Sequence, residues 1–329
     1  MRRHLPLTLA LATALFLTTL FIATSAQAAE DTIRKGFNVA EGGTLRLDGA
    51  VGDIKVVTGG TGVAIEVIRK ARGRKGEERL REHRIEFKQS GNDVIIDSDY
   101  EDRWDNWFRF TDNYEVQWNI RVPSRYNVDV RTSGGGIDLA DIGGTVEART
   151  SGGGIKTGRL SGDATLKTSG GSIRVGSASA NLLAHTSGGS IEIGDTTGPV
   201  EAKTSGGSIT LARVGGSVLA RTSGGGIRVE DAMGSVDAST SGGSITARLS
   251  RQPQGDSRLS TSGGSVSVSI ADNLNLELDA RSSGGGVRSD LPITVQGKQD
   301  DDALRGRIGS GGPKLVLRSS GGGIRVKGL

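Results

Sequence analysis

The chain lacks cysteine altogether, which excludes a disulfide framework and a lipid anchor attached through cysteine. It has only three histidines, and the two beyond residue 28, His83 and His185, lie in unlike contexts. This argues against a zinc site of ordinary ligand composition. Aromatic residues make up 4% of the chain and hydrophobic residues 34%, whereas 53 residues are glycine. So little bulky apolar material argues against one thick core and favours an array of units with a thin, repeated core.

A strong excess of one charge is also missing. The formal net charge is +4, which leaves +2 after Arg2 and Arg3 are subtracted. Such a nearly balanced chain gives no reason to expect bulk binding to nucleic acid.

Residues 1–28 have the pattern of a secretory signal peptide. Arg2 and Arg3 form a positive n-region, Leu5 to Thr24 an apolar stretch, and Ala26-Gln27-Ala28 a small-residue cleavage site. We therefore expect a mature chain that starts at Ala29, has no transmembrane segment and is exported to the periplasm, the cell surface or the medium. The alternative is an uncleaved membrane anchor, because the apolar stretch is nearly long enough to span a bilayer.

Glycine is concentrated in a Ser-Gly-Gly unit that recurs at a constant interval of 18 residues. The regular copies begin at Ser133, Ser151, Ser169, Ser187, Ser205, Ser223 and Ser241. Further copies at Ser262, Ser283 and Ser320 follow at longer, uneven intervals, as expected of the same unit with loop insertions. A constant interval excludes a merely glycine-rich linker and indicates a repeat architecture.

One unit contains two short strands and two turns. Residues 146–150 alternate small apolar and charged side chains, residues 151–154 supply turn glycines expected at positive φ, and residues 155–157 form a second strand. The predicted fold is all-β, a parallel β-solenoid (β-helix) with about 18 residues per coil. Columns of Ile, Val and Ala should face inward, and a column of Thr should also face inward, with hydroxyls stacked along the axis. The Ile column comprises Ile137, Ile155, Ile173, Ile191, Ile209, Ile227 and Ile245.

The chain resembles a family of putative adhesins with β-strand repeats. The resemblance rests on Trp118-Asn119-Ile120-Arg121-Val122-Pro123, on Tyr126-Asn127-Val128-Asp129-Val130, and on the repeated Thr-Ser-Gly-Gly-Gly-Ile, and covers about residues 37–329. It implies a β-helical fold and an envelope or surface location, and no catalytic residues come with it. Some relatives are linked to envelope-stress responses, which supplies a second functional class.

The sequence predicts three regions: a signal peptide (1–28), an N-terminal region of degenerate coils with a charged and aromatic cap (29–127), and the regular solenoid (128–329). Basic residues 69–88 precede acidic residues 93–105, and we expect the two segments to face each other or to be solvated; the alternative is a polyanion-binding patch. A short helix is expected near residues 77–83. Aromatic side chains crowd into the next segment, where they either cap the open end of the solenoid or form a partner-binding surface. The candidates for such a surface are Trp104, Trp107, Phe108 and Tyr114.

The sequence has no recognisable catalytic, cofactor or metal site. It contains no Gly-x-Ser-x-Gly and no phosphate-binding loop, and the regular Asp of calcium-binding solenoids is missing after the glycines. A polysaccharide-active β-helix enzyme is a remote alternative, because acids are scattered among the units. We expect no enzyme activity and no cofactor.

One exterior column is mostly cationic and is called the basic row below. It precedes the Thr column and comprises Arg131, Arg149, Lys167, His185, Lys203 and Arg221. Stacked cations about 5 Å apart repel each other, so nearby acids such as Glu147 and Glu201 should offset them. The row is either a solvated face that keeps the rod soluble or a track for an anionic glycan or lipid headgroup.

These observations predict a non-catalytic, exported cell-envelope protein, an adhesin-like scaffold or binding rod. The alternative is an accessory of envelope-stress signalling that binds a membrane-protein partner through the aromatic segment. The chain stops at Leu329, just after the strand-like Ile324-Arg325-Val326, and no cap is evident there. Self-association through that C-terminal edge is therefore also expected as an option.

Overall fold

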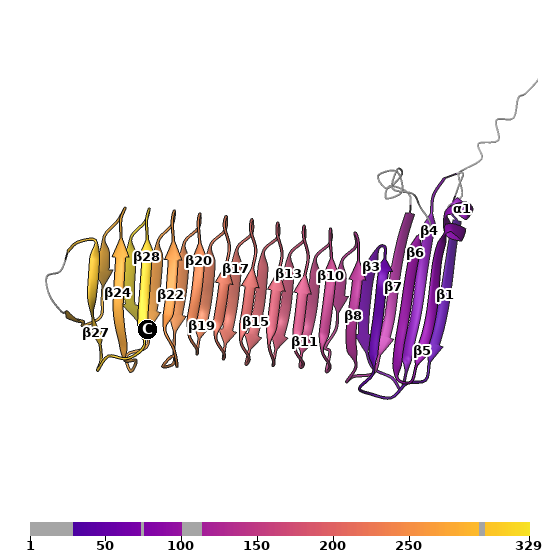
Figure 1. Ribbon diagram of the computed structural model, residues 1–329, viewed down its shortest axis with the longest axis horizontal. Helices are drawn as coiled ribbons and strands as arrows, with labels where there is room; N and C mark the ends of the chain where they lie inside the picture. Colours follow the sequence, from indigo (N-terminus) through magenta and orange to yellow (C-terminus); the bar gives the residue numbers. More distant parts are fainter. Residues whose placement is uncertain (1–28, 74–75, 101–113, 296–299) are drawn as a thin grey trace, which may run out of the picture.

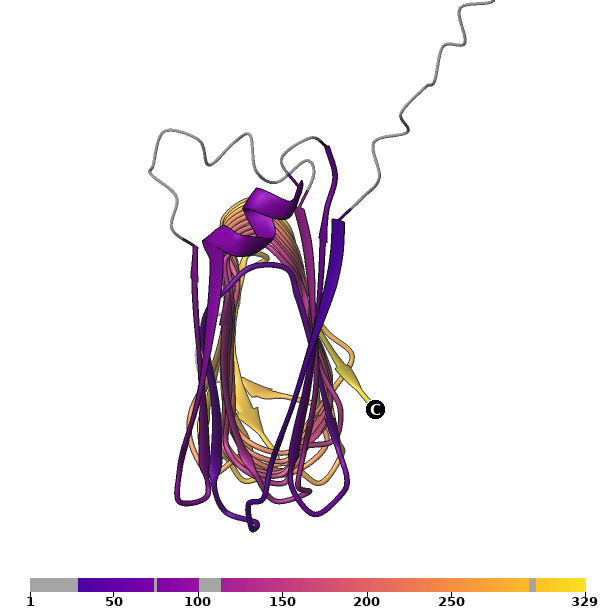
Figure 2. The ribbon, with the colours of Figure 1, turned by 90° about the vertical axis from the view of Figure 1, so that its right-hand side faces the viewer.

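The computed structural model describes residues 29–73, 76–100, 114–295 and 300–329, and all statements below concern these residues. They form a straight rod of β-strands stacked side by side, with one short helix at the N-terminal end (Figure 1). Seen from that end, two sheets face each other across a narrow interior (Figure 2). Sheet A has 14 strands and sheet B has 15. The predicted all-β fold of repeated, mostly parallel strands is confirmed.

The N-terminal region consists of β1 (Ala29–Phe37), β2 (Thr44–Ala50), β3 (Asp53–Thr58), β4 (Val63–Ala71), α1 (Gly76–Glu82), β5 (His83–Ser90), β6 (Asp93–Tyr100) and β7 (Tyr114–Val122). Strands β2, β3 and β4 lie in the region where the sequence predicts degenerate coils. The predicted helix near residues 77–83 corresponds to α1, and His83 begins β5 instead of ending the helix.

The repeated region alternates between the two sheets. Its sheet B strands are β8 (Asn127–Thr132), β10 (Val146–Thr150), β12 (Ala164–Lys167), β14 (Leu182–His185), β16 (Val200–Lys203), β18 (Val218–Arg221), β20 (Val236–Thr240) and β22 (Ser257–Thr261). Its sheet A strands are β9 (Ile137–Leu139), β11 (Ile155–Leu160), β13 (Ile173–Ala178), β15 (Ile191–Thr196), β17 (Ile209–Val214), β19 (Ile227–Ala232), β21 (Ile245–Leu249) and β23 (Val266–Ile270).

Strand pairing follows the spacing of the sequence repeat. In sheet B, Val146 lies beside Ala164, and Leu182 beside Val200, so partners are 18 residues apart. The Ile column forms a ladder in sheet A, in which Ile155 lies between Ile137 and Ile173. These side chains are buried, as are the Val and Ala columns opposite them. The predicted apolar ladders are therefore confirmed.

The Thr column is also buried, as expected, but its hydroxyls do not bond to one another. Thr150 Oγ1 donates to the carbonyl oxygen of Gly135 (2.7 Å), and Thr168 Oγ1 to that of Gly153 (2.8 Å). Each hydroxyl thus binds the Ser-Gly-Gly turn of the preceding unit. The expectation of a hydroxyl stack was wrong because a backbone acceptor lies closer than the neighbouring threonine.

The repeat glycines are required for a reason other than the one predicted. Positive φ occurs at nine described glycines, such as Gly42 and Gly52, and at none in the repeat units that begin at Ser133 to Ser241 and at Ser262, Ser283 and Ser320. A Cβ on Gly153 would instead lie 2.2 Å from the carbonyl oxygen of Gly135. The second glycine of each unit therefore permits close stacking of successive turns, since any larger side chain would overlap the turn before it.

The N-terminal end departs from parallel stacking. Strand β1 pairs with β4, β4 with β7, and β5 with β6, all antiparallel, whereas β3 and β2 pair in parallel with β9 and β8 and so join the repeat. The basic and acidic segments face each other here, as one reading of the sequence predicted. Lys88 Nζ on β5, for example, lies 3.2 Å from Asp97 Oδ2 on β6.

The C-terminal end is built out of chain order. Its strands are β24 (Leu276–Ser282), β25 (Val287–Ser289), β26 (Thr294–Val295), β27 (Ala303–Ile308), β28 (Lys314–Ser319) and β29 (Ile324–Gly328). Strand β28 lies between β22 and β24, and β29 between β23 and β25. The last unit in the sequence is therefore internal. The prediction that residues 324–326 lie at an open edge was wrong. The chain returns, and its last two strands insert between the unit of β22 and β23 and the unit of β24 and β25, which precede them in the sequence. The space that β28 and β29 fill is called the slot below.

Candidate functional site

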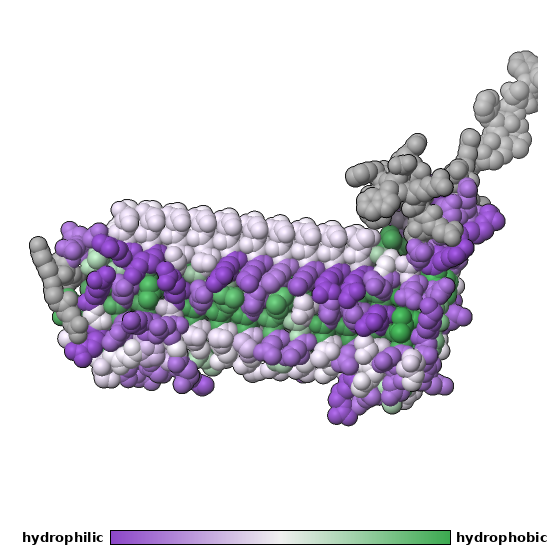
Figure 3. All heavy atoms as spheres, viewed as in Figure 1, coloured by the Kyte–Doolittle hydropathy of each residue, from purple (hydrophilic) through white to green (hydrophobic). Residues whose placement is uncertain are grey.

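The outer face of sheet B carries the basic row. Successive members lie on neighbouring strands, with Arg149 beside both Arg131 and Lys167, and His185 beside both Lys167 and Lys203. Arg221 completes the row on β18. A hydrophilic band runs along this face just below the pale line of Ser-Gly-Gly turns, and hydrophobic patches lie beneath it (Figure 3). The predicted alignment of these six side chains is confirmed by the strand register.

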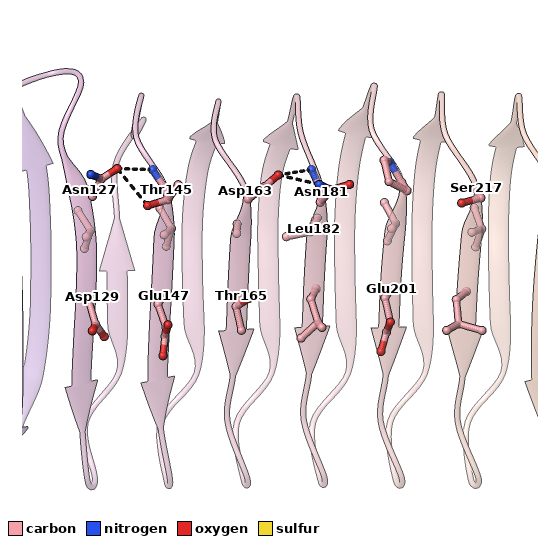
Figure 4. Close-up of a pocket in the computed structure, with 18 of the residues that line it drawn as sticks. Asn127, Asp129, Thr145, Glu147, Asp163, Thr165, Asn181, Leu182, Glu201 and Ser217 are labelled. Carbon is pink, nitrogen blue, oxygen red and sulfur yellow. Dashed lines mark hydrogen bonds between the residues drawn. The ribbon is translucent and has the colours of Figure 1, made fainter. Parts of the chain in front are cut away.

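A second row lies two residues before the basic row on the same face. It comprises Asp129, Glu147, Thr165, Leu183, Glu201, Leu219 and Asp237. Its labelled members line up across successive strands in Figure 4. Two apolar and one hydroxyl side chain therefore interrupt a row of carboxylates.

The carboxylates of the second row pair with most of the basic row. Glu147 Oε1 lies 3.2 Å from an Arg131 nitrogen and also contacts Arg149. Glu201 Oε1 lies 3.0 Å from His185 Nε2 and 2.6 Å from Lys203 Nζ. The bond to Lys203 is the largest cause of a lowered pKa at Glu201. Arg221 is bound by Asp237 at 3.3 Å. As expected, acids offset the repulsion between stacked cations.

Lys167 is the exception in the basic row. It has no ion pair or side-chain hydrogen bond among the described residues, and its side chain is half-buried. The second-row positions beside it are Thr165 on the same strand and Leu183 on the next, neither of which carries charge. Its neighbours in the basic row, Arg149 and His185, are bound by Glu147 and Glu201 respectively, one on each side of this gap. The gap therefore leaves one cation available to an outside anion.

A shallow groove of about 890 Å³ runs beside these rows along the same face. Its far rim is a line of short polar side chains at the second turn of each unit. There Asn127 Oδ1 accepts a hydrogen bond from the Thr145 amide (2.9 Å), and Asp163 Oδ1 accepts one from Asn181 Nδ2 (2.9 Å). Figure 4 shows both pairs bridging adjacent strands. The rim is thus held rigidly by bonds between neighbouring units.

His185 is the titratable member of the basic row. Burial lowers its pKa below the usual value, its hydrogen bond to Glu201 opposes that change, and the nearby Lys203 and Lys167 charges add to the lowering. The imidazole is therefore neutral at neutral pH.

Of the four residues predicted to form an aromatic partner-binding surface, the structure describes only Tyr114, and this side chain is buried. Trp104, Trp107 and Phe108 lie outside the described residues. Tyr114 is 7% exposed, on β7, and its hydroxyl lies 2.6 Å from His83 Nδ1. The assignment of Tyr114 to a partner-binding surface was wrong, because alternation along β7 turns it toward the core with Trp118.

A buried polar cluster near this tyrosine was missed by the sequence analysis. His83 is 3% exposed, and its Nε2 lies 2.8 Å from Ser98 Oγ. Arg69 donates to the His83 carbonyl oxygen (2.8 Å) and contacts Asp31. Burial, and next the Arg69 charge, lower the pKa of His83 to about 4. Residues from five strands (β1, β4, β5, β6 and β7) assemble this cluster, so no local sequence pattern predicts it.

The described residues hold no group of three or more His, Cys, Asp or Glu side chains placed to bind a metal ion. Within the same ranges, no helix has the length and apolarity that a membrane span requires.

A family model called Toastrack DUF4097 matches residues 52–327. The chain belongs to the Toastrack DUF4097 family. The matched range includes the whole basic row and the second row, and reaches almost to the end of the Toastrack DUF4097 chain. No curated protein matches this sequence.

Several solved structures are similar to this Toastrack DUF4097 protein. A putative cell adhesion protein from Clostridium sporogenes has 10% identity and a TM-score of 0.24, covering 92% of this chain and 100% of its own. A putative adhesin from Bacteroides fragilis has 13% identity and a TM-score of 0.33, covering 91% and 97%. A putative lipid binding protein from Parabacteroides distasonis has 11% identity and a TM-score of 0.35, covering 91% and 98%.

Proposed function

We propose that this protein is a non-catalytic, exported cell-envelope protein whose rod binds an anionic glycan on the outer face of sheet B. The observation that carries the proposal is the unpaired Lys167 in a row of otherwise paired cations. The signal-peptide pattern of residues 1–28 supports export. The acids of this face bind neighbouring cations instead of converging in a pocket, which supports a binding role over a catalytic one.

The carboxylates narrow the site from a continuous track to a short segment. A polyanion laid along the whole row would meet Asp129, Glu147 and Glu201 as well as the cations. Between the second and third of these acids, the second row offers only Thr165 and Leu183. Adjacent strands are about 4.8 Å apart, so this window is about 10–15 Å long. It suits one or two acidic sugar units of a longer chain.

The chemistry of the window suits a charged sugar. Lys167 supplies a point charge for a carboxylate or sulfate group, and the Thr165 hydroxyl can donate or accept a hydrogen bond. Leu183 offers an apolar surface on which the C–H face of a sugar ring can pack. Arg149 retains guanidinium donors beyond its contact with Glu147, since an arginine carries five.

Binding of fluorescently labelled alginate, a linear polymer of uronic acids, tests this function. Lys167→Ser should lower the affinity about tenfold, the loss of roughly one charge-assisted hydrogen bond. The matched control is Lys156→Ser, which removes the same charge from an exposed position of the opposite sheet. Equal affinities in the two variants, or equal binding of uncharged dextran by the protein, would contradict the proposed site.

A further inference from the structure

The two ends of the rod differ in the strand edges that they present. At the C-terminal end the outermost strands are β25, with three residues, and β26, with two. At the N-terminal end they are β1, with nine residues, and β5, with eight. Among the described residues, no strand pairs with the outer side of either. A long unpaired edge is a template for strand addition, whereas a very short one is blunted.

The N-terminal end also leaves apolar side chains incompletely covered. Ile33 and Phe37 on β1, and Ile85 and Phe87 on β5, pack against the core but are only partly buried. The edges lie on opposite sides of the narrow interior in Figure 2. Extending both sheets beyond β1 and β5 would therefore also extend the core between them.

The charges along β1 are complementary to a second, antiparallel copy of β1. If a two-fold axis passes through Ile33, Asp31 of one copy lies opposite Lys35 of the other, on the core-facing side of both strands. Asp31 Oδ1 is buried and has no hydrogen-bond partner among the described residues, although Oδ2 contacts Arg69. Lys35 is exposed. The second copy would thus bring a cation beside the partly exposed Asp31 carboxylate.

The charges along β5 follow the same rule about Ile85. An antiparallel pairing centred there places Arg84 opposite Glu86 of the other copy, and both side chains are exposed on their own chain. Each edge therefore has an apolar residue at its centre and opposite charges at equal distances on either side of it, which is the condition for self-complementary pairing.

One axis can serve both edges, because the two central residues lie at the same level. In sheet A, Ile33 is opposite Val67, which leads across β7 and β3 to Ile137, the first residue after a Ser-Gly-Gly turn. In sheet B, Ile85 is opposite Ser98, level with Thr132, the last residue before that turn. Thr132 and Ile137 flank the same turn, one on each sheet. The central residues of the two edges, Ile85 and Ile33, therefore lie at the same height along the strands.

We propose that two copies of this protein join at their N-terminal ends in a two-fold dimer, β1 against β1 and β5 against β5. The partner is a second copy of this chain, and the product is one continuous rod with a C-terminal end at each tip. The inference is independent of glycan binding. The other role of such charges, as protection against edge pairing, predicts a monomer.

The absence of native cysteine allows a direct test. Ile33→Cys places one thiol from each copy across the axis, where Cα atoms of facing antiparallel residues are about 4.5–5.5 Å apart, within disulfide range. We expect a rapid disulfide-linked dimer on mild oxidation, and the same for Ile85→Cys. The matched control is Val295→Cys, at the edge strand of the opposite end, where Val295 is 37% exposed. Equal cross-linking of all three variants would show random collision and overturn the proposal.

Exchanging the charges of Arg84 and Glu86 gives a second test, which needs no cross-link and measures reversible dimerisation. In sedimentation velocity the protein should have twice the chain mass at micromolar concentration. Glu86→Arg places like charges together across the axis and should weaken dimerisation at least tenfold. The double variant Arg84→Glu with Glu86→Arg restores the pairing and should restore the dimer. A monomeric protein at all concentrations, or a double variant no better than the single one, would contradict the proposed interface.

Discussion

Thr168 donates its hydroxyl hydrogen to the carbonyl oxygen of Gly153, 15 residues earlier, at 2.8 Å. The same bond recurs from unit to unit, and in the irregular units at the C-terminal end serine takes the place of threonine. A side-chain column therefore fastens each turn to the next strand. This bond and the close stacking of the glycines together position each unit on the previous one.

Removing one such hydroxyl should destabilise the rod. Thr186→Val keeps the shape of the side chain but leaves the Gly171 carbonyl oxygen without its 2.8 Å donor. We expect a loss of about 1–2 kcal/mol in the free energy of unfolding, because Thr186 is buried and the bond is partly shielded from water. Thr186→Ser retains the donor and should cost less. Urea unfolding followed by circular dichroism measures both, and a valine variant as stable as the serine variant would contradict the role assigned to the hydroxyl.

Substitution of a stacked glycine should be more damaging. In Gly153→Ala the new Cβ would lie 2.2 Å from the Gly135 carbonyl oxygen, so the turns must separate. We expect a loss of about 3 kcal/mol or more, or a failure to fold. Gly134→Ala is the control, because a Cβ there meets no atom within 4 Å. Comparable thermal unfolding of the two variants would refute the stacking argument.

Neutralising several members of the basic row should abolish alginate binding. In Arg149→Ser, Lys167→Ser and Lys203→Ser combined, Glu147 and Glu201 each lose one cationic partner, so their negative charges repel a polyanion more strongly. The matched control removes Lys156, Arg174 and Arg213 from sheet A, where the two arginines are likewise paired with acids. Binding by the control should persist and weaken as salt rises. If both triple variants lose affinity equally, the effect is one of net charge and the site is wrong.

The buried His83 should make the N-terminal end less stable in mild acid. Its pKa is about 4 in the folded protein, against 6.5 for the ordinary side chain, so the unfolded state binds more protons between these values. Stability from this group is complete above pH 6.5 and falls as the pH drops. We expect a loss of about 2 kcal/mol between pH 7 and 5.

Tryptophan fluorescence can follow this change, because all three tryptophans lie between residues 104 and 118. Urea unfolding at pH 7 and pH 5 should show the loss in the natural protein. His83→Asn should be less stable overall but should lack most of the pH dependence. His185→Asn, on the surface of sheet B, is the control and should retain it. An unchanged slope in His83→Asn would assign the effect to other groups.

The C-terminal unit should be essential to the end of the rod. Deleting residues 314–329 removes β28 and β29 and exposes Leu259, Leu278 and Val268 along both sides of the slot. We expect aggregation, or a gap closed only with loss of the β24–β27 end. Deletion of residues 327–329 alone is the control and should leave the protein soluble. Light scattering distinguishes the two, and a soluble, fully folded long deletion would show that the slot can close without its occupant.

Sequence periodicity predicted the part of the fold that depends on local spacing. A constant interval of 18 residues aligns Ile155 with Ile137 and Lys167 with Arg149, so the ladders and the basic row followed directly. The sequence also shows that Thr165 and Leu183 occupy positions where other units carry acids. That this leaves Lys167 without an ion pair became clear only from the ion pairs of Arg149 and His185 in the structure.

The parts that could not be predicted depend on contacts between distant segments. Alternation along residues 114–122 turns Tyr114 inward, yet its His83 partner comes from a strand that follows the helix. The insertion of β28 and β29 leaves no mark in the repeat itself, because residues 314–328 have the same pattern as an end unit. The longer intervals after Ser241 predicted loop insertions, and not the divergence of stacking from chain order that the structure shows there.

The returning C-terminal unit also bears on how the protein is made. A rod that stacks in chain order could fold progressively as it emerges from the ribosome or the export channel, each unit resting on a finished one. Here the unit formed by β24 and β25 is joined to β22 and β23 only through β28 and β29, which follow them in the chain. Closure of the rod therefore depends on complete synthesis, and a prematurely terminated chain keeps an apolar slot that proteases and chaperones can recognise.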